Sequence, residues 1–519
     1  MKFFNRILAV SLLALLSACA TVPPGATSPS SVSQGTKPAR VAPTPMAPTA
    51  TTQGPQYPSG TLTPIATYES GPRAVIPLTP PADLWERIRR GFAMPDLEGE
   101  LVQGREQWYA ARPDALANMA ERSRKYLFYI VEELERRNMP TELALLPFIE
   151  SAFNPQALSH ARAAGMWQFI PSTGKQFQLK QNAFRDDRRD VQASTRAALD
   201  YLEKLYRMFG DWHLALAAYN WGEGSVARAI AKNQRAGLGT RYAELSMPME
   251  TRYYVPKLQA MKNIVARPDN FKIKLPAIDN HPFFDTVTIT RDIDLTLAAK
   301  LAEIPLDDFK ALNPSIHRPV ILAAGTPQIL LPWDNADLFQ RNLDAYVGSP
   351  LSSWTVWIAP RTMKAAEAAN QVKMNEADLR AVNNIPANML IQAGSTLLVP
   401  RPANLERDVT EGVADNGQIS LSPEMVLRRF VIKAGKKETV ATVAHHYNLP
   451  PAKVAEWNKL GKSTSFKPGQ PVVIYRLVAA NAPVSAKVVT SAGHAAAKPV
   501  AAAQASANKR RTPTRVARR

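Results

Sequence analysis

The spacing of apolar residues changes near residue 280 and divides the chain into two kinds of structure. Before that point apolar residues recur every three to four positions, as in Leu199, Leu202 and Leu205, which is the spacing of an amphipathic helix. Beyond it, short strand-like runs alternate with short helical stretches. The pattern predicts a multidomain protein, with a mainly α-helical domain at 82–275 followed by small α+β modules.

Capping residues predict where individual helices begin and end. One helix is expected from residue 113 to the residue before Pro140, with Asp114 as its cap. Another is expected to begin at Ser194 or Thr195 and to end at Gly210, because glycine adopts the left-handed conformation that closes a helix.

An internal repeat of about 50 residues occupies much of the second half of the chain. Each copy opens with a strand and closes with a glycine and a second strand, which gives a βααβ unit with an antiparallel strand pair. The predicted copies span 283–333, 352–401 and 428–477, and their opening strands are expected at 286–290, 354–358 and 430–433. An asparagine follows an apolar residue at Asn313, Asn383 and Asn458. The first copy is the most degenerate, and the alternative is that it serves only as a spacer.

The N-terminus has the pattern of an export signal. Residues 1–19 combine Lys2 and Arg6 with a short apolar stretch that is too short to span a membrane. The stretch ends in Leu16-Ser17-Ala18-Cys19, which resembles the lipobox of bacterial lipoproteins. Because Ala20 and not aspartate follows, the resemblance implies a lipid anchor on Cys19 in the outer membrane, facing the periplasm. The alternative is an ordinary signal peptide with an incidental cysteine.

Two terminal segments lack the apolar residues that a folded domain needs. Residues 20–80 are mainly Pro, Thr, Ser, Ala and Gly, and residues 478–519 are rich in Ala, Val, Lys and Arg. Such compositions cannot bury enough apolar surface to fold. We expect a disordered tether before the helical domain and a disordered basic tail at the end.

The composition narrows the set of partners and cofactors. The formal net charge of +19 favours an anionic partner, such as nucleic acid, a membrane surface or an acidic cell-wall polymer. Export argues against nucleic acid. Cys19 is the only cysteine, and the adjacent His445 and His446 would point to different faces. We therefore predict no disulfide, no metal site and no cofactor.

One carboxylate stands at the end of an apolar run. Residues 143–149 are apolar or proline, and Glu150 follows them. Thr141 is expected to cap this helix, and Pro147 to kink it, because proline lacks an N–H and the Leu143 carbonyl would lose its partner. A carboxyl group in a dry place keeps its proton to higher pH. The interpretation is a general acid, and the alternative is a solvated helix end.

No second carboxylate stands out as a catalytic partner. Asp211 is expected to cap a helix, and Glu223 is expected in an exposed turn. Asp186, Asp187 and Asp190 alternate with arginines, which indicates structural ion pairs. Most glycosidases use two carboxylates, and substrate-assisted enzymes are an exception.

Three short motifs resemble those of a known family. Glu150-Ser151, Gly165-Met166-Trp167-Gln168 and Ala218-Tyr219-Asn220 follow one another with Ser159 between the first two. In order and spacing they are similar to the signatures of the soluble-lytic-transglycosylase-like (SLT) domain, glycoside hydrolase family 23, which has a lysozyme-like fold. The repeats resemble LysM modules, which bind chains that contain N-acetylglucosamine.

The resemblance implies a murein-degrading lytic transglycosylase, a lyase that remodels or turns over the cell wall. Glu150 would protonate the oxygen of the β-1,4 bond between MurNAc and GlcNAc. It would then accept the proton of the sugar's own 6-hydroxyl, leaving a 1,6-anhydro-MurNAc end. The implied partner is the peptidoglycan glycan strand. The implied substrate-binding residues are Ser151, Ser159, Met166, Trp167, Gln168, Tyr219, Asn220, Tyr253 and Tyr254.

Some of these assignments have structural alternatives. Met166, Trp167 and Phe169 would lie under a sugar ring, although Trp167 and Phe169 would equally suit a core. Ser151 would equally suit a turn. Tyr253 is preferred over Tyr254 as the residue that closes the site over Glu150.

Two other functions remain open from the sequence. A muramidase would use water and release reducing ends. A non-catalytic tether would bind glycan through its repeats alone.

Overall fold

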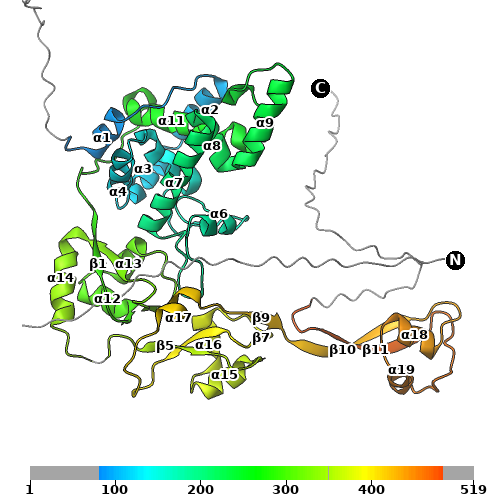
Figure 1. The fold of residues 1–519 in the computed structure, drawn as a ribbon. Helices are drawn as coiled ribbons and strands as arrows, with labels where there is room; N and C mark the ends of the chain where they lie inside the picture. The colour runs from blue at the N-terminus through cyan, green and yellow to red at the C-terminus, as the bar shows by residue number, and fades with distance from the viewer. Residues whose placement is uncertain (1–80, 349, 483–519) are drawn as a thin grey trace, which may run out of the picture. The chain divides into compact units, whose positions relative to one another are not determined.

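The computed structural model describes residues 81–348 and 350–482. The chain divides into two units, Met1–Pro77 and Leu78–Arg519, and every described residue belongs to the second. The predicted signal peptide, the Cys19 anchor, the tether at 20–80 and nearly all of the tail at 478–519 lie outside the described residues. The predicted fold class is confirmed, because helices up to residue 271 precede small α+β modules (Figure 1).

The first region consists of helices packed around one core. Residues from helices throughout this region share its buried apolar cluster, and Trp85, Leu116 and Trp167 are among the most buried. The elements are α1 (Leu84–Arg90), α2 (Glu100–Ala110), α3 (Pro113–Ser123), α4 (Leu127–Arg136), η1 (Thr141–Leu145), α5 (Leu146–Ser151), α6 (Pro171–Gln176), α7 (Val191–Phe209), α8 (Trp212–Trp221), α9 (Glu223–Arg235), η2 (Tyr242–Glu244), α10 (Met249–Arg252), α11 (Tyr254–Ala266) and η3 (Pro268–Phe271).

Several predicted helix boundaries are wrong. The helix expected from residue 113 is two helices, α3 and α4, and Asp114 lies in the first turn of α3, after its cap. Helix α7 begins earlier than expected, because the Asp190 side chain accepts a hydrogen bond from the N–H of Ala193 and caps it. Gly210 does close α7 in the left-handed conformation, and Asp211 caps α8, as predicted.

The segment that carries Glu150 changes from a 3-10 helix to an α-helix at Leu146. Thr141 does not cap it; the Thr141 hydroxyl donates instead to the carbonyl of Ile88. The Leu143 carbonyl keeps a partner, because the N–H of Leu146 donates to it across the 3-10 turn. Pro147 then falls in the first turn of α5, where a missing N–H costs little. The reason for expecting a kink, a Leu143 carbonyl without a partner, is therefore absent.

The second region consists of three βααβ modules. Their antiparallel pairs are β1 (Phe284–Thr288) with β4 (Gln328–Pro332), β5 (Trp354–Ile358) with β8 (Thr396–Pro400), and β10 (Met425–Lys433) with β11 (Pro471–Ala479). The second opening strand matches its prediction, and the other two begin a few residues earlier than expected. The helices between the strands are α12 (Leu295–Leu301), α13 (Leu306–Leu312), α15 (Ala365–Gln371), α16 (Glu376–Asn383), α18 (Val440–His446) and α19 (Pro451–Asn458).

The sequence did not predict the smaller elements of this region. Short strands form the β2–β3 and β6–β7–β9 sheets. These strands are β2 (Ile293–Asp294), β3 (Val320–Ile321), β6 (Met363–Lys364), β7 (Met389–Ile391) and β9 (Leu421–Pro423), and the added helices are α14 (Trp333–Asp344) and α17 (Glu411–Asn416).

The recurring asparagine joins the second helix of each module to its closing strand. In the second module the Asn383 amide nitrogen donates to the carbonyls of Leu379 and Leu398, and its oxygen accepts from the N–H of Leu398. Asn313 and Asn458 make the same three bonds in their own modules. A buried amide must fill its hydrogen bonds, which explains why the residue type recurs in every copy.

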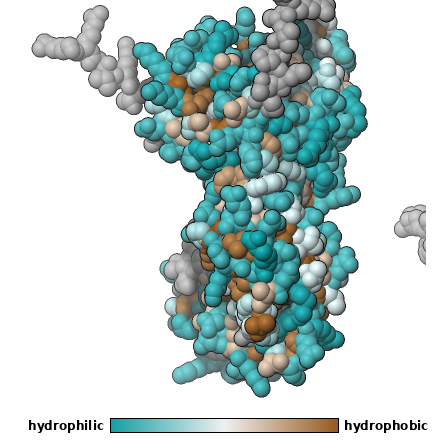
Figure 2. Space-filling model, turned by 90° about the vertical axis from the view of Figure 1, so that its left-hand side faces the viewer, coloured by the Kyte–Doolittle hydropathy of each residue, from teal (hydrophilic) through white to brown (hydrophobic). Residues whose placement is uncertain are grey.

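The visible face in Figure 2 is mostly hydrophilic, with apolar residues scattered over it. None of the helices at 81–348 and 350–482 is long and apolar enough to cross a membrane.

Candidate active site

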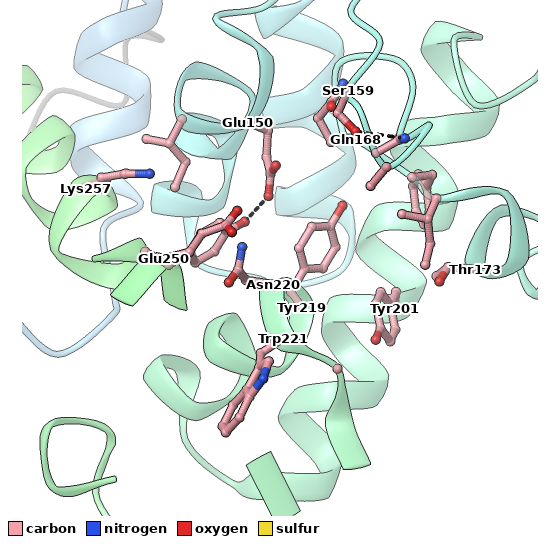
Figure 3. A pocket seen from close by; sticks show the side chains of 17 residues that line it. Glu150, Ser159, Gln168, Thr173, Tyr201, Tyr219, Asn220, Trp221, Glu250 and Lys257 are labelled. Atoms are coloured by element: carbon pink, nitrogen blue, oxygen red, sulfur yellow. Dashed lines mark hydrogen bonds between the residues drawn. The ribbon is translucent and has the colours of Figure 1, made fainter. Parts of the chain in front are cut away.

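A cavity of about 500 Å³ lies beside Glu150. It is lined by the end of α5, the segment that follows α5, residues of α6 and α7, the C-terminal turn of α8, and α10 and α11. Figure 3 shows the Glu150 carboxylate pointing into the space beside Tyr219 and Asn220. The lining residues are Ile149, Glu150, Ser159, Ala161, Ala163, Gln168, Phe169, Ile170, Thr173, Tyr201, Tyr219, Asn220, Trp221, Gly222, Glu250, Tyr254 and Lys257.

Glu150 is held in a partly buried position in the last turn of α5. The phenol of Tyr254 donates a hydrogen bond to its Oε1. Burial raises the pKa of Glu150 to about 7, although the Tyr254 hydrogen bond and the Lys257 charge act in the opposite direction. A carboxyl group with this pKa can give and accept a proton near neutrality.

Two phenols are placed as hydrogen-bond donors beside Glu150. Burial, with the nearby Glu150 charge, raises the pKa of both Tyr219 and Tyr254 well above the usual value for a phenol. Both therefore stay protonated at neutral pH. The Tyr219 hydroxyl donates to the carbonyl of Trp167 at 2.9 Å, which fixes α8 against the segment that carries Gln168.

The polar residues of the predicted motifs line the same cavity. The Ser159 Oγ accepts from the N–H of Ala163 at 3.0 Å. Gln168 has a left-handed backbone (φ 50°), and its Nε2 donates to the carbonyl of Gly165 at 2.8 Å. No group in the described part of the chain donates a hydrogen bond to its Oε1, which leaves this oxygen available to a ligand. The Asn220 Oδ1 accepts from the hydroxyl of Thr251 at 2.8 Å.

Four predicted substrate-binding residues, Ser151, Met166, Trp167 and Tyr253, do not line the cavity. Met166 and Trp167 are fully buried, and the Trp167 Nε1 donates to Thr195 Oγ1 at 3.0 Å inside the core. The Ser151 Oγ donates to the Met166 carbonyl at 3.0 Å, so it connects α5 to the next motif. The prediction that Met166 and Trp167 lie under a sugar ring is wrong, and only Phe169 of that group reaches the cavity.

Tyr254, and not Tyr253, covers Glu150. The ring of Tyr253 lies outside the cavity lining and packs under the Arg105 guanidinium at 4.5 Å. The preference for Tyr253 is therefore wrong. Successive residues at a helix start face different directions, and the sequence alone could not distinguish the two.

A second carboxylate, which the sequence did not reveal, lines the cavity. Glu250, in α10, is exposed, and its charge contributes to raising the pKa of Glu150. Lys257, Tyr201 and Thr173 were also missed. The available signal was weak, because Glu250 is marked only by lying three residues before Tyr253 in the sequence.

Glu223 is not in an exposed turn. It is the first residue of α9, where it accepts from the Tyr201 hydroxyl and from Lys204 Nζ, each at 2.8 Å. The hydrogen bond from Lys204 is the main cause that lowers the pKa of Glu223. Glu223 therefore acts as an anionic support for Tyr201.

The acidic segment before α7 forms ion pairs, as predicted. Asp186 pairs with Arg188 at 2.7 Å, and Asp187 with Arg185 at 3.5 Å. Asp190 instead caps α7.

Known proteins match this chain over most of its length. Family models match at 128–238 (Transglycosylase SLT domain), 283–347 (Lytic transglycosylase MltD, LysM-like domain) and 369–400 with 432–474 (LysM domain). The membrane-bound lytic murein transglycosylase D of Escherichia coli (strain K12) is 30% identical over 409 residues, which cover 77% of this chain and 86% of that protein. The chain belongs to the lytic murein transglycosylase D family. The predicted enzyme class is confirmed: it is a lytic transglycosylase that acts on peptidoglycan.

Two further matches cover smaller parts of the chain. A protein of Alteromonas sp. (strain M-1) named for tributyltin chloride resistance is 43% identical over 162 residues, 31% of this chain and 76% of that protein. The solved structure of an inactive mutant of lytic transglycosylase Slt from Pseudomonas aeruginosa matches with 22% identity and a TM-score of 0.21, over 29% of this chain and 25% of that one.

Proposed function

We propose that the enzyme cleaves the β-1,4 bond between MurNAc and GlcNAc and leaves a 1,6-anhydro-MurNAc end. The observation that carries this proposal is the carboxyl group of Glu150, whose pKa is raised to about 7 at the wall of a polar cavity. Glu150 gives its proton to the glycosidic oxygen, and GlcNAc leaves with that oxygen as a hydroxyl group. The MurNAc 6-hydroxyl oxygen then bonds to C1, and its proton passes to Glu150. The N-acetyl oxygen of MurNAc stabilises the cationic centre between these steps.

The polar groups around Glu150 would hold the two sugars. Ser159 and Gln168 present an oxygen to the cavity, and Tyr219 and Asn220 face them from the end of α8. These groups suit the N-acetyl and hydroxyl groups of a glycan. Phe169 and Ile170 supply apolar surface beside them.

Glu250 supports one competing reaction. Its carboxylate shares the cavity with Glu150, and a water activated by a second carboxylate would make the enzyme a hydrolytic muramidase. Digestion of purified sacculi in ¹⁸O-labelled water separates the reactions. We expect anhydro-MurNAc ends that contain no label, read by mass spectrometry. Labelled reducing MurNAc ends would establish hydrolysis, and no soluble fragments at all would support a glycan-binding tether without catalysis.

The N-terminal signal and the LysM modules support a location for the reaction. The signal at 1–19, with Cys19 at its end, supports a lipid anchor in the outer membrane facing the periplasm, and the LysM modules would hold the glycan near the cavity. Radiolabelled palmitate should label the full-length protein and should not label Cys19→Ser.

The alkaline limb of the activity profile should report the protonation of Glu150. Because the acid must be protonated to start the reaction, kcat/KM should fall above pH about 7, which is the pKa of Glu150. In Tyr254→Phe the carboxylate loses a hydrogen bond that favours its charged form. Its pKa should rise and move the limb upward by about one to two pH units.

Tyr253→Phe is the matched control, because its ring lies outside the cavity lining. A limb that moved equally in both variants, or downward in Tyr254→Phe, would contradict this role of Tyr254.

A further inference from the structure

We propose that Arg188 is a positioning residue, which holds the substrate-binding loop 159–169 in its active shape. This loop joins the helix of Glu150 to α6 and carries Ser159 and Gln168. Arg188 itself does not line the cavity, so any effect on the glycan must pass through the loop. The inference rests on the proposed roles of Ser159 and Gln168.

The guanidinium of Arg188 bonds to two distant points of the loop. Its Nη1 donates to the carbonyl of Arg162 at 2.6 Å and to the carbonyl of Phe169 at 3.2 Å. The side chain is buried, with the residue 7% exposed. Charge-assisted bonds of this kind are stronger than neutral ones and lose little to solvent when buried.

The carboxylate of Asp186 fixes the direction of this guanidinium. Arg188 Nε donates to Asp186 Oδ1 at 2.9 Å, and Nη2 donates to Oδ2 at 2.7 Å. The two parallel bonds leave Nη1 aimed at the loop. The N–H of Asp186 also donates to the carbonyl of Ser315 at 3.0 Å, so the first LysM-like module supports the same pair.

The internal bonds of the loop transmit this restraint to the cavity. Ala164 and Phe169 exchange backbone hydrogen bonds of 3.0 and 3.2 Å. Ser159 is bonded to Ala163 through both its N–H and its Oγ. Gln168 directly precedes Phe169, and Ser159 lies three residues before Arg162, so both cavity-lining residues lie close in the chain to the two carbonyls that Arg188 holds.

Lysine cannot make the set of hydrogen bonds that Arg188 makes. A lysine ammonium is a single point charge, whereas the planar guanidinium bonds a carboxylate on one side and two carbonyls on another. In Arg188→Lys the loop should keep its fold but lose one or more of these restraints.

The test compares Arg188→Lys with Arg185→Lys in the full chain. Arg185 is a partly buried arginine of the same segment, paired with Asp187 and Asp415, and it makes no hydrogen bond to loop 159–169. With soluble glycan strands as substrate, Arg188→Lys should raise KM about tenfold, equivalent to the loss of about 1.4 kcal/mol of binding. We expect kcat to change much less and the alkaline limb set by Glu150 to stay in place.

Any one of three results would overturn the proposal. One is an equal rise of KM in Arg185→Lys. Another is a fall of kcat with a shifted alkaline limb, because Arg188 would then act on Glu150. If Arg188→Lys fails to fold, Asp186→Asn serves as the second variant. It weakens the two bonds between Arg188 and residue 186 but leaves the guanidinium in place, so a smaller rise of KM is expected. An unchanged KM in Asp186→Asn would also overturn the proposal. The products of the wild-type enzyme are read in the same assay, so a failure of the proposed reaction is recognised separately.

Discussion

Glu150→Gln should abolish glycan cleavage and leave the fold and glycan binding intact. The amide has almost the same shape and keeps an oxygen that can accept the hydrogen bond from Tyr254. It has no acidic proton that it could transfer at neutral pH, and general acid catalysis alone contributes about 10² to 10⁴ in rate. The expected result is no detectable release of soluble fragments from sacculi, with unchanged binding of soluble glycan strands. Full activity in this variant would refute the assignment of Glu150.

The same variant should be more stable than the wild type at neutral and alkaline pH. The pKa of Glu150 is about 7 in the folded protein and about 4.5 without the fold. Between these values the folded state binds more protons than the unfolded state, so the free energy of unfolding falls as pH rises from 4.5 to 7. The loss of stability that comes from keeping a charged Glu150 in the folded protein persists above pH 7 and amounts to at most about 3 kcal/mol. Urea unfolding at pH 4.5 and pH 8 should show the gain of Glu150→Gln only at the higher pH.

Glu223→Gln offers a control of opposite sign. The pKa of Glu223 is lowered by its hydrogen bonds, that from Lys204 first. Its charged form therefore stabilises the fold above pH about 4.5, the usual value for Glu, and this contribution is lost as pH falls further. This variant should lose stability at pH 8, where Glu150→Gln gains it.

The sequence grouped several residues that line the cavity but could not show which side chains of its motifs face it. The motifs placed Glu150, Ser159, Gln168, Tyr219 and Asn220 in one cavity, because order and spacing are visible in a sequence. The facing direction depends on backbone conformation. The left-handed backbone of Gln168 directs it to the cavity, while the preceding Trp167 enters the core.

The fold was predicted best where several signals agreed. Strand pairs in the modules followed from short apolar runs, a glycine and an asparagine. Helix starts failed where several capping residues competed. Asp190, Ser194 and Thr195 all suit a helix start, and Asp190 caps α7 because the apolar stripe continues back to the buried Val191. Glu250 was missed because 100 residues separate it from Glu150 and only the fold brings them together.

Gly165→Ala should remove activity by displacing the loop that carries Ser159 and Gln168. Gly165 has φ +83°, and a Cβ at this position would lie 1.9 Å from the carbonyl oxygen of Arg188. That atom belongs to the backbone and cannot rotate away as a side chain would. The loop must move, and with it the Trp167 carbonyl that holds Tyr219. We expect a loss of about 3 kcal/mol or more in the free energy of unfolding and a fall of at least about 10² in kcat/KM.

Gly210→Ala is the control that measures the cost of a left-handed backbone without a steric clash of the added Cβ. Gly210 is also left-handed, with φ +64°, but no atom lies within 4 Å of an added Cβ. This variant should lose only about 1 kcal/mol and keep its activity, because Gly210 lies outside the cavity lining. Thermal unfolding and kcat/KM of both variants give the comparison. Equal losses in the two would mean that the close approach of Gly165 to Arg188 does not constrain the active site. A much larger loss in Gly165→Ala would locate that constraint at the contact between the loop and the segment of Arg188.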